Sequence, residues 1–140
     1  MPLFPIVFKY KTVNRPDGTQ VKIPSIPISL NGKVKFDTIA LLDSGADISC
    51  MPKDLAEVLG LDLNKEKSHA YGIGGMVDSV ETKVSITVQK GHERYTLDIP
   101  FKVIFSNYDF PLILGRDGFF DKFIITFDQD KERVSLKKTK

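Results

Sequence analysis

Residue types that build specialised sites are scarce in this sequence. It contains one cysteine, no tryptophan and two histidines among 140 residues. The single cysteine excludes a disulfide within the chain and a cysteine-bound metal cluster, and the two histidines, His69 and His92, lie far apart in the sequence and in no metal-binding motif. We therefore predict no metal site, and we interpret Cys50 as a small buried hydrophobic residue rather than a redox-sensitive thiol.

Long hydrophobic runs and an excess of one charge are also missing. No apolar stretch approaches the ~20 residues needed to cross a bilayer, and the first residues lack the basic head and long apolar stretch of a signal peptide. Lysine and arginine number 20 against 18 acidic residues, and the net charge of +2 is too small to favour broad phosphate binding. The composition thus predicts a cytoplasmic protein with neither a membrane nor a nucleic acid as its partner.

What is present suits a single globular domain over residues 1–140. Hydrophobic residues make up 41% of the chain and charged residues 27%, as in ordinary soluble domains. A chain of this size buries roughly 68–70% of the surface that it exposes when unfolded. Neither a linker nor an internal repeat divides the sequence, so we expect one core.

Hydrophobic residues recur with period two, and turn residues recur about every 8–12 positions, which predicts a mainly β sandwich or barrel. Residues 4–13 should form the first strand. Hairpins are expected at Asn31-Gly32, a strong turn signal, and at Lys90-Gly91. The run 39–42 is apolar on both faces, which predicts a strand inside the core.

Two short helical segments are expected beside the strands. Pro52 at the first turn and Gly60 beyond the end favour a helix over residues 52–59, with its apolar residues on one face. A second helical turn is expected over residues 116–121. The domain is therefore mainly β with one or two short helices.

The first segment suited to chemistry is the run 43–47, Asp-Ser-Gly-Ala-Asp, which follows two leucines predicted to be buried. A lone ionised carboxylate is expensive to remove from water, so Asp43 needs a structural or catalytic reason at this position. A plain turn is the alternative, because Asp, Ser and Gly are common turn formers.

Two further segments have unusual composition. Three glycines surround Ile73 in the run 72–75 and indicate a hairpin tip whose backbone can approach a ligand, or else a plain flexible loop. A phosphate-binding loop is excluded there, because no helix pattern and no Lys-Ser/Thr pair follow. Arg116 follows the predicted buried run 112–114, and we expect its guanidinium to pair with the Asp47 carboxylate in a structural role rather than a catalytic one.

Taken in order, these three segments resemble the retropepsin-type aspartic proteases, the retroviral protease family and its cellular relatives. The resemblance extends from about Ile26 to Phe127. It implies the retropepsin fold, a closed barrel-like acid-protease domain, and an aspartic endopeptidase that needs no cofactor. The first 20 residues lie outside the resemblance, and we interpret them as an extension that forms a strand or an arm.

The resemblance also implies a role for each residue of the run 43–47. Asp43 would be the catalytic aspartate, and the Ser44 hydroxyl would cross-link two active-site loops. Gly45, Ala46 and Asp47 would bind the backbone of the substrate.

The remaining roles fall on the other two segments. Ile73 and Gly74 would form the tip of a flap that closes over the substrate, and Ile113 would line a side-chain pocket. Gly115 and Arg116 would support the active-site loop.

A single Asp-Ser-Gly triplet supplies only one carboxyl, whereas aspartic proteolysis uses two that share one proton. The resemblance therefore predicts a homodimer in which each copy contributes Asp43 and whose substrate is a polypeptide. The competing hypothesis is a peptide-binding or protein-binding module that kept the fold and lost effective catalysis.

Overall fold

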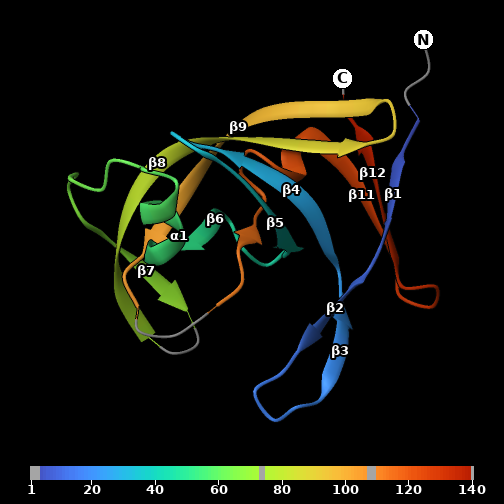
Figure 1. Ribbon diagram of the computed structural model, residues 1–140, viewed down its shortest axis with the longest axis horizontal. Helices are drawn as coiled ribbons and strands as arrows, with labels where there is room; N and C mark the ends of the chain where they lie inside the picture. Colours follow the sequence, from blue (N-terminus) through green and yellow to red (C-terminus); the bar gives the residue numbers. More distant parts are fainter. Residues whose placement is uncertain (1–3, 73–74, 107–109, 140) are drawn as a thin grey trace.

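The computed structural model describes residues 4–72, 75–106 and 110–139, which fold into a mainly β protein (Figure 1). One α-helix and one 3-10 turn accompany the strands in these ranges. The elements in chain order are β1 (Ile6–Lys9), β2 (Lys11–Asn14), β3 (Gln20–Ile23), β4 (Ser25–Asn31), β5 (Lys35–Leu42), β6 (Ser49–Pro52), α1 (Lys53–Val58), β7 (Ser68–Gly72), β8 (Gly75–Lys90), β9 (Glu93–Ile104), β10 (Ile113–Leu114), η1 (Phe120–Lys122), β11 (Phe123–Asp128) and β12 (Arg133–Lys138). None of the helices in the described ranges has the length and hydrophobicity needed to cross a membrane.

The strands of the described ranges form three sheets. The largest has seven strands in the order β4-β5-β10-β6-β9-β8-β7, and β4 also pairs with β8. Pairing therefore returns to its starting strand, and only β7 lies outside this ring. A three-stranded sheet has the order β1-β12-β11, and β2 and β3 form a separate two-stranded sheet.

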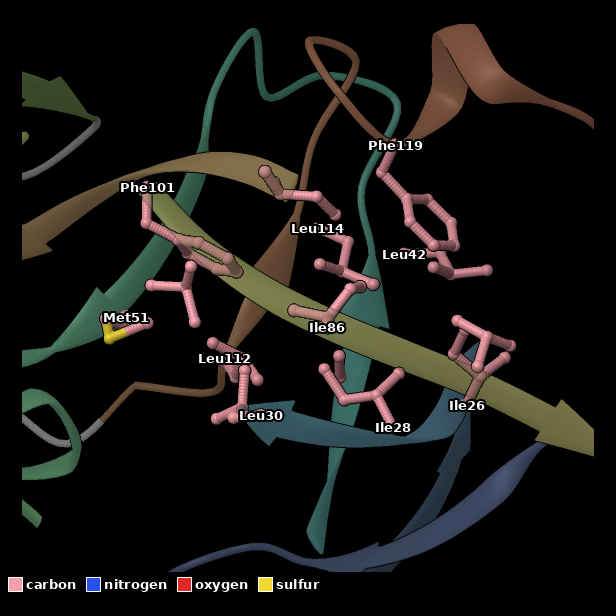
Figure 2. Close-up of a cluster of buried hydrophobic side chains, with 14 of the residues drawn as sticks. Ile26, Ile28, Leu30, Leu42, Met51, Ile86, Phe101, Leu112, Leu114 and Phe119 are labelled. Carbon is pink, nitrogen blue, oxygen red and sulfur yellow. The ribbon is translucent and has the colours of Figure 1, made fainter. Parts of the chain in front are cut away.

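The core fills the inside of the large sheet, where side chains from β4, β5, β8, β9 and β10 meet (Figure 2). Strand β5 contributes only one face to it, since Ala40 and Leu42 are buried whereas Ile39 is 38% exposed. The expectation that the run 39–42 is buried on both faces was therefore wrong. Successive strand residues point to opposite sides of a sheet, and the outer side of β5 is open to solvent at Ile39.

Both predicted hairpins are present, but the first has a different turn. Lys90 pairs with Glu93 across a tight turn in which Gly91 has φ 61°, as expected. In the β4–β5 hairpin, Asn31 pairs with Lys35, so the connection is the three-residue segment 32–34 rather than a two-residue Asn-Gly turn.

Close packing explains the glycine at position 32. A Cβ there would lie 2.5 Å from the carbonyl oxygen of Leu59, just beyond α1. The helix itself agrees with the prediction, because it follows Pro52 and ends before Gly60, whose φ of 72° provides a left-handed stop.

The two ends of the chain differ in detail from the expectation. Residues 4–13 form two strands rather than one, because the chain changes partner at Tyr10, with β1 paired to β12 and β2 to β3. Tyr10 is buried, and its backbone N–H donates to Glu132 O at 2.9 Å. The helical turn expected over 116–121 becomes a turn followed by the 3-10 segment η1.

Candidate active site

The run 43–47 leaves the end of β5 and begins the connection to β6. The Asp43 backbone N–H donates to Leu114 O at 3.1 Å, and the Asp43 carbonyl accepts from the N–H of Ala46 at 3.1 Å. One carboxylate oxygen of Asp43 accepts the N–H of Gly45 at 2.9 Å. The half-buried carboxyl is therefore fixed at the start of a tight turn and remains reachable from solvent.

Strand β10 supports this turn from the neighbouring position in the sheet. It is parallel to β5, with Ile113 beside Leu41 and Leu114 beside Leu42. Leu42 and Leu114 are 4% and 0% exposed and lie in the hydrophobic cluster (Figure 2). Because each leucine is directly followed by a site residue, burial of the pair determines where Asp43 and Gly115 lie.

The segment after β10 is joined to the Asp43 loop through its backbone. The N–H of Arg116 donates to Ala46 O, and the N–H of Asp117 donates to Asp47 O, both at 2.9 Å. A Cβ at position 115 would lie 2.8 Å from Ala46 O, so only glycine permits the two segments to approach this closely.

The expected ion pair between Asp47 and Arg116 does not join these segments. Within the described part of the chain their side chains form no salt bridge, and the Asp47 carboxylate instead accepts the N–H of Ile48 at 2.9 Å. Both side chains are exposed, where water solvates the charges and an ion pair gains little. The contact between the two segments is made by the main chain.

Sequence reasoning missed Ser49, the first residue of β6, whose side chain holds the segment after β10 in place. Its side chain is 0% exposed, and its Oγ accepts the N–H of Gly115 at 2.9 Å. The available signal was strand alternation, because Ser49 and Met51 are the buried residues of β6. A serine on the core side of a strand needs a hydrogen-bond partner.

Cys50 lies in β6 beside the site, and its side chain is only partly buried. It is half-buried, pairs with Ile113 across β6 and β10, and its Sγ donates to Ile48 O at 3.6 Å. Burial raises the pKa of the Cys50 thiol above its ordinary value, and the carboxylates of Asp47 and Asp43 add to the rise against an opposing effect of Lys102. The thiol is therefore protonated at neutral pH.

The glycine-rich run lies at the end of the β7–β8 hairpin. Gly72 and Gly75 are register partners, and Tyr71 is opposite Met76. Ile73 and Gly74, predicted as the flap tip, lie outside the described residues. Tyr71 and Met76 are 79% and 55% exposed, so this end of the hairpin presents apolar side chains to solvent.

The residues that the structure brings together are thus the Asp43 loop, Ile113, Gly115 and Arg116. In the described ranges, no group of three or more histidine, cysteine or acidic side chains is arranged to hold a metal ion. The chemistry that this arrangement offers is that of a carboxyl on a tightly braced loop.

Comparison with known proteins assigns a family to this arrangement. Residues 26–117 match the family described as aspartyl protease. The chain belongs to the aspartyl protease family. The matched segment contains the Asp43 loop, β10 and the first residues after β10.

Comparison with solved structures shows which fold this chain has. A retropepsin-like aspartic protease from Rickettsia conorii matches it with a TM-score of 0.59 and 20% sequence identity. The alignment covers 97% of this chain and 92% of the other. The fold is therefore retropepsin-like. No curated protein sequence matches the chain significantly.

Proposed function

We propose that this protein is an aspartic endopeptidase that hydrolyses peptide bonds in extended polypeptides, with one Asp43 from each of two copies. In this proposal residues 1–140 form one protease domain and half of an active site. The observation that carries it is the half-exposed Asp43 carboxyl at the end of a buried strand, on a loop braced by β10, in a chain of the aspartyl protease family.

Two carboxyls are required because peptide hydrolysis needs a base and an acid together. One carboxylate removes a proton from water as its oxygen attacks the peptide carbon, and the other carboxyl protonates the carbonyl oxygen. The carbon–nitrogen bond then breaks as the amine takes up a proton. Two unit charges ~4 Å apart repel by ~4 kcal/mol at an effective dielectric constant of ~20, so one carboxyl of a dyad keeps its proton.

The loop around Asp43 has the groups to hold an extended substrate. Gly45, Ala46 and Asp47 lie beside the catalytic carboxyl. Of their backbone groups, the Gly45 carbonyl and the Asp47 N–H are not used in the hydrogen bonds described above, and a strand-like peptide binds through such groups. Ser44 is exposed, and its hydroxyl forms no hydrogen bond with another described residue, so it is available to link the two loops of a dimer.

The other segments complete the proposed substrate site. Ile113, half-buried beside the Asp43 loop, would line a side-chain pocket. Gly115 and Arg116 would hold the loop in place through the main-chain contacts described above. Ile73 and Gly74 would close over the bound peptide and exclude water, and water and the two carboxyls suffice without a cofactor.

The test is cleavage of a peptide library from about pH 3 to pH 8 by the wild-type protein and by Asp43→Asn. We expect cleavage by the wild type and a rate reduced on the order of 10²–10⁴-fold in Asp43→Asn. The amide oxygen introduced by this change can accept the same Gly45 N–H, so the fold should be retained. A folded, dimeric wild type that cuts nothing across this pH range would favour the peptide-binding module.

A further inference from the structure

The hairpin formed by β2 and β3 is set apart from the rest of the fold. Its register runs from Lys11 opposite Ile23 to Asn14 opposite Gln20. Among the described strands, these two pair only with each other. Figure 1 shows the hairpin projecting from the body of the molecule between β1 and β4.

The hairpin has little in its own chain to stabilise it. A two-stranded hairpin is marginal in water unless another element covers it. A salt bridge from the hairpin to the body joins Lys22 and Glu132 at 3.9 Å with both side chains exposed, and such pairs contribute little. Val13 and Val21 are opposite each other and only half-buried, so one side of the hairpin is incompletely covered.

The base of the hairpin lies beside the strand that leads to Asp43, because the N–H of Leu42 donates to Pro24 O at 3.0 Å. In Figure 1, β5 ends at the lower side of the body, and the loop to β6 begins there. The β7–β8 hairpin and the β2–β3 hairpin both extend past this loop toward the lower edge of the view, one at each side of it. In this view the loop to β6 therefore lies between the two hairpins.

A dimeric active site makes this position informative. If two Asp43 carboxyls meet, the twofold axis passes beside Asp43, because identical groups face each other across such an axis. An element that lies next to Asp43 and projects from the body toward this axis would contact the second copy. The β2–β3 hairpin begins next to Leu42, through the contact with Pro24, and projects from the body of the molecule, so it has the reach to contact a second copy.

We propose that the β2–β3 hairpin is a dimer arm that packs on a second copy of this chain beside the paired Asp43 loops. The side bearing Val13 and Val21 supplies apolar contact area, and the free edges of β2 and β3 offer unpaired backbone groups. The proposal rests on the proposed function, since the active site is incomplete without the second copy. It gives the N-terminal segment outside the family match a specific role in assembling the site.

The first experiment measures the dimer dissociation constant by sedimentation equilibrium for the wild type and for the double variant Val13→Lys, Val21→Lys. We expect the double variant to raise this constant at least about tenfold, since charged ends replace apolar contact at the interface. The matched control is Val34→Lys, since Val34 is 51% exposed in the turn at the other end of β4. Equal constants for the double variant and the control would overturn the proposal.

A second variant keeps the test informative if the double variant is poorly folded. Lys11 and Ile23 are register partners, so residues 12–22 can be replaced by Asn-Gly without separating β1 from β4. This shortened chain should retain the wild-type circular dichroism signal of the larger sheets and be monomeric where the wild type is dimeric. A shortened chain that dimerises as tightly as the wild type would equally overturn the arm.

Peptide cleavage by the same samples separates this proposal from the proposed function. Activity per chain should return to the wild-type value when the double variant is concentrated enough to form dimers, because the catalytic residues are untouched. A wild-type dimer that is weakened by arm variants but cleaves no peptide supports the arm and contradicts the protease. A protease whose dimer is indifferent to the arm supports the protease and contradicts the arm.

Discussion

The Asp43 loop and the end of the β7–β8 hairpin differ in how the rest of the chain holds them. The loop is joined to the segment after β10 by backbone hydrogen bonds, and that segment is in turn bonded to the buried Ser49 hydroxyl of β6. At the hairpin end, Tyr71 and Met76 are largely exposed, and β7 has no strand partner other than β8 in the described sheet. The carboxyl is thus held by the core, while the end of the hairpin is held only by the pairing of β7 with β8.

The largest loss of stability is expected from adding a side chain at Gly115, where the segment after β10 approaches the Asp43 loop most closely. Gly115→Ala places a Cβ 2.8 Å from Ala46 O and 2.9 Å from the carbonyl carbon of Ile48, both of them main-chain atoms. We expect destabilisation at the upper end of the ~1–3 kcal/mol range for overpacking, measured by urea unfolding. A change below ~0.5 kcal/mol would show that the loop adapts easily, and the contrast between the two regions would fail.

A comparison of two buried serines sharpens the same contrast. Ser49 Oγ accepts the Gly115 N–H, whereas Ser25 Oγ is equally buried and has no partner among the described residues. Ser49→Ala should destabilise by ~1–3 kcal/mol because it leaves a buried N–H unsatisfied. Ser25→Ala should be neutral or stabilising, and equal losses in both variants would contradict the role given to Ser49.

A substitution at the end of the β7–β8 hairpin should have the opposite effect, with little change in stability and a larger change in activity. Tyr71 is 79% exposed, so Tyr71→Ala should change the free energy of unfolding by less than ~0.5 kcal/mol. If the hairpin closes over substrate, the same variant should lower kcat/KM by about tenfold, on the order of one lost apolar contact. Unchanged kinetics would remove Tyr71 from the proposed flap, and a large loss of stability would show that the hairpin end is part of the core.

Several elements of the fold and one segment of the candidate site could be predicted from local sequence. Alternation and turn residues located the hairpin at Gly91 and the helix after Pro52, because these signals act within a few residues. The segment with Asp43 was singled out because a carboxylate directly after a buried strand is costly without a reason.

What could not be predicted depends on contacts between segments far apart in the sequence. Gly32 is required because Leu59 packs against it, and Gly115 is required because Ala46 packs against it. Local turn residues predict neither contact. Complementary charge suggested that Arg116 pairs with Asp47, but the backbone makes that contact. The break between β1 and β2 at Tyr10 likewise arises because β1 pairs with β12, a strand far away in the sequence.

The central claim is that two copies of the chain share one active site, and mixing wild type with Asp43→Asn tests it most directly. The wild type is held at a concentration where it is dimeric, Asp43→Asn is added, and peptide cleavage is followed after subunit exchange, with an unrelated protein as the control. A shared site predicts that activity falls to about half with an equal amount of the variant and to about one tenth with a ninefold excess, as mixed dimers form. Activity that stays constant through the titration would contradict the account, because each chain would then act alone.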